Sequence, residues 1–485
     1  MATEVTMIQH IVPTPKNVQL LDGQSTVGLV IECDEAFSEY KKTLKAAFKK
    51  LFKITLTDGC GGITLRKIDT LPHQSYRYDT RDGIVLSASD DEGILYAIAT
   101  LIQTATVKDG SLTVSKALIE DHPDKEFRAL MVDLAREWHP AVTVHQYIDL
   151  CFILKVKYLH LHFIDNERYT LPSRAFPDLN DEESYTYEEI ESMREHAKSM
   201  GIIIIPEFEV PGHAAKLTTA YPEIFANEID SEVETEKTEN GVIIADASVV
   251  CAGSYRIMDG IRTLLAEMCE LFPDAPYIHI GGDEANIKVW SSCKKCREYM
   301  KTNAISGIYE LYSEFVGRTA RAVLDMGKTP IVWEGFPKDG ICHIPKETVV
   351  IAWETMYHMP YDLIAEGFKV INASWKPLYV VPNVEPRFNW GIAEILDWNV
   401  YNWQHWYEKS AACEKPINVD PTEQVIGAML CLWECTFEQE IYRGMRNLAA
   451  LSERTWSTER HWSDTEFMHR ANATLNRIAR FIQTV

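Results

Sequence analysis

The sequence predicts an α/β protein in which a small α+β domain precedes a (β/α)8 TIM barrel. Three observations lead to this fold class. Eight apolar, β-rich runs follow one another after about residue 125, helical segments separate most of them, and the residues before them show shorter, alternating runs instead. A length of 485 residues suits one small domain followed by one large barrel.

The N-terminal α+β domain is predicted to span residues 1–124. Helical stretches at 34–50 and 91–106 interleave with its short strands, and the second has apolar residues at helical spacing after an acidic first turn. The segment IEDHPDKEF (119–127) holds a proline and a charge cluster, which indicates the domain boundary. The predicted strands are 27–33, 52–59, 62–67, 75–80 and 83–89.

The catalytic barrel is predicted to span residues 125–485. Its near-continuous apolar runs are typical of strands buried on both faces of a parallel sheet. Two longer stretches, 213–255 and 375–423, exceed plain connectors and are predicted to be functional loops. The helical segments include 186–200 and 307–326. The predicted strands are 127–134, 158–165, 201–210, 277–284, 329–335, 348–354, 368–374 and 424–433.

Composition excludes several classes of protein. The 48 basic and 71 acidic residues give a net charge of −23, which disfavours nucleic acid and anionic membrane surfaces as partners. The chain has no apolar run of about 18 residues and no basic-then-apolar N-terminal signal, so a cytoplasmic location without a membrane span is predicted. The 11 scattered cysteines favour reduced thiols over a disulfide framework.

The C-terminal ends of the predicted barrel strands carry an unusual set of side chains, and such ends form the active site in TIM barrels. Any one of these acids can also be interpreted as a helix cap or as part of an ion pair at the rim, but the whole set favours a functional site. These strand-end residues are Asp133, Arg136, Asp165, Glu207, Glu209, His213, Asp283, Glu284, Trp333, Glu334, Trp353, Glu354, Asn372, Trp433 and Glu434.

Tryptophan is concentrated in the same half of the chain. Eight of the 12 tryptophans fall between residues 333 and 433, and two or three of these are expected to be core residues. The broad apolar face and single N–H of an indole suit a flat partner with hydroxyls at its edge, such as a pyranose ring.

The segment HIGGDEA (279–285) is the most specific local pattern. Its two glycines let the backbone turn closely, and the adjacent Asp283 and Glu284 then project in different directions from a strand end. Two carboxylates whose surroundings push their pKa values apart are typical of enzymes that cleave glycosidic bonds. A rim pair that binds a metal or caps a helix is the alternative interpretation.

HIGGDEA resembles the signature of the family 20 glycoside hydrolases, the β-N-acetylhexosaminidases. Segments 129–140, 159–165, 206–214, 430–434 and 448–456 resemble the same family in the same order. The resemblance implies an exo-acting enzyme that removes terminal β-linked GlcNAc or GalNAc with retention of configuration. In this mechanism the substrate's own acetamido carbonyl attacks the anomeric carbon. The implied partner is a small carbohydrate, with no cofactor and no metal, and a homodimer stays open.

The resemblance also implies roles for the residues around the reacting bond. Glu284 is expected to be the general acid and base, and Asp283 to orient the acetamido N–H. Tyr379 is expected to donate to the acetamido oxygen. The pocket walls implied by the resemblance are Trp333, Trp353 and Trp433.

Three further residues match positions that hold the terminal sugar or support the acid. Arg136 in the DLAR segment is expected to grip sugar hydroxyls, for which a guanidinium fork is suited; the alternative is an ion pair with Asp133. Asp165 and His213 match a relay behind Glu284.

The chain departs from the family pattern in three places. NERYT (166–170) replaces an acidic residue and a Gly-Trp pair, Val381 stands where the family often has Asp, and Cys435 stands where it often has Glu. The last two positions usually read outer hydroxyls, so recognition at O4 and O6 stays open. Glu434 is predicted to be the substitute contact.

The residues leave two rival functions to consider. A metal-dependent hydrolase on the same fold would use His160 and His162 or the pair Cys293 and Cys296, but further ligands at other strand ends are missing from the pattern. A non-catalytic sugar-binding protein is disfavoured because both carboxylates and the arginine are present.

Overall fold

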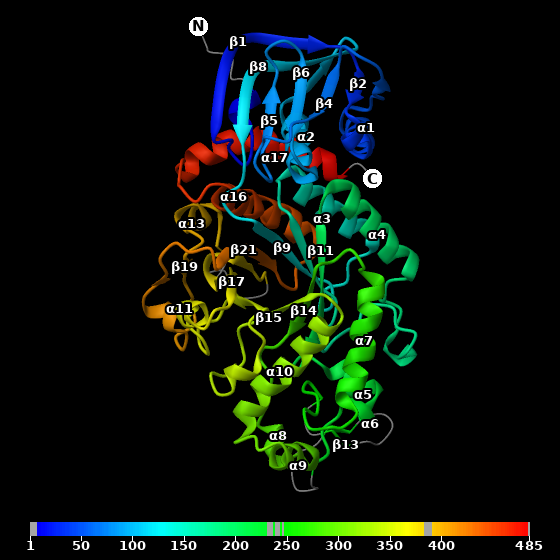
Figure 1. Ribbon diagram of the computed structural model, residues 1–485, viewed down its shortest axis with the longest axis vertical. Helices are drawn as coiled ribbons and strands as arrows, with labels where there is room; N and C mark the ends of the chain where they lie inside the picture. Colours follow the sequence, from blue (N-terminus) through cyan, green and yellow to red (C-terminus); the bar gives the residue numbers. More distant parts are fainter. Residues whose placement is uncertain (1–6, 230–235, 238–242, 245–246, 383–389, 484–485) are drawn as a thin grey trace.

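The computed structural model describes residues 7–229, 236–237, 243–244, 247–382 and 390–483. Figure 1 shows the N-terminal domain at the top and the barrel with its helices below it. Helix α17, the last of the chain, lies between them and contacts both α1 of the small domain and α3 of the barrel.

The N-terminal domain is a mixed sheet with helices α1 and α2 packed against it. The strand order is β1-β8-β5-β6-β4-β2-β3, with β7 paired to β8. The strands are β1 (Asn17–Val27), β2 (Val30–Cys33), β3 (Thr57–Asp58), β4 (Ile63–Lys67), β5 (Tyr76–Asp79), β6 (Ile84–Ala88), β7 (Thr106–Lys108) and β8 (Ser111–Asp121).

This domain corrects part of the sequence prediction. The predicted strand 52–59 is reduced to Thr57–Asp58, because helix α1 continues to Phe52. The long strands β1 and β8 were not predicted. Most of β1 is exposed, and its pairing with β8 shifts register between Leu20 and Gln24, so the chain there lacks the regular alternation that identifies a strand.

Eight parallel strands close into the predicted barrel, and all eight predicted runs are confirmed as its strands. The order is β17-β16-β15-β14-β11-β10-β9-β21, and pairing of β17 with β21 closes the cylinder. Their bounds are β9 (Phe127–Asp133), β10 (Tyr158–His162), β11 (Ile203–Val210), β14 (Tyr277–Gly281), β15 (Thr329–Trp333), β16 (Val349–Ala352), β17 (Lys369–Asn372) and β21 (Val425–Leu432).

The connections between the barrel strands contain short additional strands, and helices surround the barrel. The extra strands are β12 (Glu236–Lys237), β13 (Ile243–Ile244), β18 (Tyr379–Val380), β19 (Asn402–Trp403) and β20 (Ile417–Asn418). The α-helices are α1 (Ser38–Phe52), α2 (Asp91–Thr104), α3 (Ala141–Ile153), α4 (Tyr187–Met200), α5 (Ala215–Ala220), α6 (Pro222–Phe225), α7 (Ile257–Leu271), α8 (Val289–Ser292), α9 (Lys294–Thr302), α10 (Ile308–Asp325), α11 (Pro360–Ala365), α12 (Trp375–Leu378), α13 (Ile392–Asp397), α14 (Ala411–Glu414), α15 (Phe437–Gln439), α16 (Met445–Trp456) and α17 (Asp464–Gln483). Within the described residues, no helix combines the length and the apolar character that crossing a membrane requires.

The small domain is joined to the end of the barrel where the strands begin. Trp456 is fully buried there, donates from Nε1 to Asp121 Oδ1 at 3.0 Å, and meets the Tyr96 ring edge-on at 5.3 Å. Burying such a side chain contributes ~1.5–3 kcal/mol. The mouth formed by the C-terminal strand ends faces away from this junction, so loops alone shape it.

Candidate active site

A cavity of about 180 Å³ occupies the mouth of the barrel, and nine of the ten predicted site residues line it. The tenth, Asp165, contacts three of the lining residues, Arg136, His162 and His213. The lining residues are Arg136, His162, Glu209, His213, Asp283, Glu284, Trp333, Trp353, Trp375, Tyr379, Val381, Trp433 and Glu434. They follow all eight barrel strands, as the strand-end pattern predicts.

The two acids follow β14 on a turn that requires glycine. Gly281 and Gly282 have φ of 67° and 102°, and a Cβ at Gly281 would lie 1.8 Å from Glu209 Oε1. A Cβ at Gly282 would lie 2.3 Å from Val332 Cγ2. The HIGGDEA pattern therefore has a steric cause, because only glycine fits the turn that presents Asp283 and Glu284.

Several rim residues have strained backbone. Glu284, His213 and Glu434 have φ of 46°, 51° and 54°, the left-handed region that residues with a side chain rarely adopt. Strain of this kind is concentrated at functional sites, where surrounding structure holds it.

Asp283 and Glu284 are neighbours in different environments. Asp283 is 8% exposed, and its Oδ1 has no hydrogen-bond partner among the described residues. Burial, together with the charge of Glu284, raises the pKa of Asp283 to about 7. The Glu284 side chain is 54% exposed, and a hydrogen bond with His213 lowers the pKa of Glu284. Environment thus separates the two pKa values and favours the shared proton on Asp283.

His213 connects Glu284 to a buried carboxylate. Its Nε2 lies 3.5 Å from Glu284 Oε2 and its Nδ1 lies 3.4 Å from Asp165 Oδ1. Burial opposes protonation of His213, but the hydrogen bonds to Asp165 and Glu284 prevail and raise its pKa well above the ordinary value. The surroundings of His213 therefore favour its protonated form beside Glu284.

Arg136 is fixed by two buried acids. Its Nη2 lies 2.6 Å from Asp165 Oδ2 and its Nη1 lies 3.2 Å from Asp133 Oδ2. The guanidinium also lies over the Trp433 ring, 5.0 Å from its centroid. Arg136 therefore both pairs with Asp133 and lines the cavity, and these contacts hold its guanidinium group in one orientation.

Aromatic rings form the opposite wall. Tyr379 is stacked between Trp353 and Trp375, with ring centroids 5.9 and 4.8 Å away. The ring centroid of Trp333 lies 6.2 Å from that of Trp353 and 5.9 Å from that of Trp433. Trp398 and Trp403 instead are 1% and 0% exposed in the core, in line with the expectation that a few tryptophans only pack.

A buried polar network beneath the cavity was only partly anticipated. Glu207 accepts from Trp333 Nε1 at 2.7 Å and lies 2.5 Å from His162 Nδ1, whose Nε2 reaches Asp165 Oδ2 at 3.0 Å. Burial alone would lower the pKa of His162, but the negative charge of Glu207 outweighs this effect and raises that pKa to about 10. Glu209 accepts from the Gly282 N–H at 3.2 Å. The signal for these residues was present, because His162, Glu207 and Glu209 are polar residues in otherwise apolar strands.

The departure NERYT has a bracing role. Arg168 Nη1 donates to the backbone oxygens of Ala135 and Arg136 at 3.0 and 2.9 Å. Asn166 Oδ1 accepts from the Ala215 N–H at 3.1 Å, next to His213. These contacts hold two of the loops that carry cavity residues.

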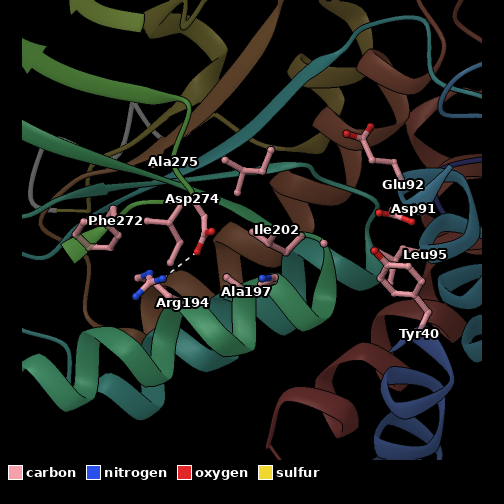
Figure 2. Close-up of a pocket in the computed structure, with 14 residues that line it drawn as sticks. Tyr40, Asp91, Glu92, Leu95, Arg194, Ala197, Ile202, Phe272, Asp274 and Ala275 are labelled. Carbon is pink, nitrogen blue, oxygen red and sulfur yellow. Dashed lines mark hydrogen bonds and ion pairs between the residues drawn. The ribbon is translucent and has the colours of Figure 1, made fainter. Parts of the chain in front are cut away.

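A second cavity of about 230 Å³ lies where β11 begins, between α2 and α4. Figure 2 shows its lining, with Tyr40, Asp91 and Glu92 on one side and an ion pair of Arg194 with Asp274 on the other. Arg194 Nη2 is 2.9 Å from Asp274 Oδ2, so these two charges of the lining are paired with each other. This cavity lacks the paired carboxylates and aromatic wall of the barrel mouth.

The candidate ligands of the metal-hydrolase hypothesis fall into separate clusters, one of histidines around Glu207 and one of cysteines. His160 and His162 each contact Glu207, at 3.0 and 2.5 Å, and His162 also contacts Asp165. Cys293 and Cys296 instead gather with Cys251, away from the cavity lining.

Comparisons with known proteins agree with this geometry. The glycosyl hydrolase family 20 catalytic domain matches residues 126–459, and domain 2 of the same family matches residues 9–122. A beta-hexosaminidase of Akkermansia muciniphila is 29% identical over 418 residues, covering 81% of each chain. One of Vibrio furnissii is 26% identical, covering 87% of this chain and 72% of its own.

Solved structures share the fold. A GH20 exo β-N-acetylglucosaminidase of Vibrio harveyi, in complex with N-acetylglucosamine, superposes with a TM-score of 0.83 at 23% identity, covering 99% of this chain and 78% of that one. A β-N-acetylhexosaminidase of Bacteroides fragilis gives a TM-score of 0.78 at 22% identity, covering 98% and 96%. The family match spans both domains and includes the barrel mouth described above. The chain therefore belongs to glycosyl hydrolase family 20, and it is a glycoside hydrolase.

Proposed function

We propose that this glycoside hydrolase is an exo-acting β-N-acetylhexosaminidase that removes terminal β-linked GlcNAc or GalNAc with retention, using the substrate's acetamido carbonyl as the nucleophile. Its curated relatives in Akkermansia muciniphila and Vibrio furnissii are named beta-hexosaminidases, which supports a hexosaminide substrate.

The observation that carries the proposal is the unpaired carboxylate oxygen of Asp283. A buried polar atom without a partner is rare and calls for one from a ligand. Asp283 lines a cavity walled by Trp353 and Tyr379, so an acetamido N–H is a donor that fits beside its unpaired oxygen. Tyr379 would then donate to the acetamido oxygen, which holds the carbonyl close to the anomeric carbon.

Retention follows from the proposed nucleophile. The acetamido carbonyl would invert the anomeric carbon once, and water would then invert it again. Glu284 is the more exposed carboxyl and lies beside His213, and it would protonate the leaving oxygen and then activate water.

The shape of the cavity supports exo action. Buried His162 and Glu209 form its base, each 1% exposed, so a glycan chain cannot pass through. Only a terminal sugar fits this closed end, with Arg136 and Glu434 at its rim.

The test compares p-nitrophenyl β-glycosides of GlcNAc, GalNAc and glucose, and follows the anomer released by NMR. We expect turnover of one or both acetamido sugars with the β-anomer formed first, and no turnover of the glucoside. Equal turnover of the glucoside would contradict the role of the acetamido carbonyl.

A further inference from the structure

Three buried thiols meet outside the active-site cavity. Cys251 Sγ lies 3.5 Å from Cys293 Sγ and 3.7 Å from Cys296 Sγ, and all three sulfur atoms lie within 4.8 Å of one another. Each of the three cysteines is 0% exposed. Cys293 immediately precedes α9 and Cys296 lies in its first turn, while Cys251 comes from the segment between β11 and α7.

The sulfur spacing matches ligands around a tetrahedral ion. A Zn–S length of about 2.3 Å places two thiolates of a tetrahedral site about 3.8 Å apart. The measured distances of 3.5 and 3.7 Å are close to that edge. They are far longer than the ~2.05 Å of a disulfide.

Backbone donors surround the sulfurs. The N–H groups of Gly253 and Cys296 point to Cys251 and Cys293 respectively. Such N–H to sulfur contacts stabilise thiolates bound to a metal. A Cβ at Gly253 would lie 2.5 Å from Cys296 Cα, so the glycine allows the Cys251 loop to approach α9.

A side-chain oxygen lies beside the cluster. Asn227 Oδ1 is 4.0 Å from Cys296 Sγ, and Asn227 Nδ2 donates to Val249 O at 2.7 Å, which turns the amide oxygen toward the thiols. Asn227 is 3% exposed. From these contacts we propose that Cys251, Cys293 and Cys296 bind a structural Zn²⁺, with its fourth position on the side of Asn227. Binding converts the thiols to thiolates and releases their protons to solvent.

The ion would brace the loops that carry catalytic groups. The Cys251 loop accepts from the Ala214 N–H through Ser248 O, and donates from Val250 N–H to Pro211 O, both at 3.0 Å. Trp290, which precedes Cys293, donates to Val250 O at 2.9 Å. The zinc would therefore tie the loop that carries His213 to the segment after Glu284, without touching substrate.

The test measures the metal content of the purified wild-type enzyme from zinc-supplemented cells, after gel filtration in metal-free buffer. We expect about one zinc per chain by inductively coupled plasma mass spectrometry. Enzyme from cobalt-supplemented cells should show thiolate-to-cobalt charge transfer and the intense visible bands of a tetrahedral site.

Four variants locate the ion. Cys251→Ser and Cys293→Ser should lose the zinc, whereas Cys151→Ser, a buried cysteine outside the cluster, and Glu284→Gln in the active site should keep it. Wild-type enzyme without zinc, a disulfide between Cys251 and Cys293 by mass spectrometry, or zinc retained in both cluster variants would each overturn the proposal. The wild-type measurement decides even if the cluster variants do not fold.

Discussion

The ends of two neighbouring barrel strands, β14 and β15, carry acids in very different settings. After β14, Asp283 has an unpaired oxygen and Glu284 is more than half exposed. After β15, Glu334 is fully buried, and its two oxygens accept four backbone N–H groups at 2.8 to 3.1 Å. The first pair is open to a ligand, whereas Glu334 is saturated by its own chain.

An acid at a strand end is therefore not by itself catalytic. Glu334 organises the loop of Glu354 to His358, which follows β16, by accepting its N–H groups. The Trp353 indole donates to Glu334 O at 2.7 Å, so the same segment helps to place the aromatic wall. One acid would perform chemistry and the other supports the scaffold that surrounds it.

The largest expected effect is that of Glu284→Gln. Removing the general acid should lower kcat on a disaccharide about 10³-fold, because the amide cannot protonate the leaving oxygen. The loss should be smaller on a p-nitrophenyl glycoside, whose leaving group needs less protonation. Steady-state kinetics on both substrates check this, and an equal loss on both would remove Glu284 from that role.

Asp283→Asn should come next, with kcat falling about 10²-fold, since the acetamido N–H loses an acceptor that can become charged. The unfolding temperature should stay near the wild-type value, because Asp283 Oδ1 makes no hydrogen bond among the described residues. Wild-type kcat in this variant would contradict a substrate-assisted mechanism.

The pH dependence follows from the same pair. Burial and the charge of Glu284 raise the pKa of Asp283 to about 7, while the hydrogen bond from His213 lowers that of Glu284. At pH values between these two pKa values the pair therefore holds one proton, and the general acid needs that proton. We expect kcat/KM to fall as pH rises through about 7, and the fall to move to lower pH in Asp283→Asn. A profile that is flat from pH 6 to pH 9 in the wild-type enzyme would exclude this titration.

Glu334→Gln should act on stability more than on chemistry. One side of the amide would present N–H groups to backbone N–H donors, which costs about 2–3 kcal/mol in a buried site. Thermal unfolding should show a lower Tm, with kcat changed far less than in Glu284→Gln. A loss of kcat as large as that of Glu284→Gln, with unchanged Tm, would abolish the distinction between the two strand ends.

This contrast also explains what the sequence could predict. The barrel was predictable because strands buried on both faces are continuous apolar runs, whereas the exposed β1 has no such signal. The site residues were predictable because strand ends converge in a barrel. The saturation of Glu334 was not, since its donors come from a loop about 20 residues later, and neither was the approach of Cys251 to Cys293, which depends on how two loops fold together.

The smallest expected effect concerns Glu434, which follows β21 and shares features with both acids. It has the left-handed backbone of Glu284, with φ of 54° and 46°, and lines the cavity beside Arg136 and Val381. If it replaces the family's missing contacts to outer hydroxyls, Glu434→Gln should raise KM a few-fold, about 1 kcal/mol, with kcat unchanged. Val381→Ala is the control, because it removes apolar contact but no hydrogen bond. Measuring KM for glycosides of GlcNAc, of GalNAc and of a 6-O-methyl derivative identifies the hydroxyl that Glu434 contacts. A change at that hydroxyl should alter KM less in Glu434→Gln than in the wild-type enzyme. An unchanged KM for every sugar would mean that Glu434, like Glu334, supports the scaffold and does not contact the substrate.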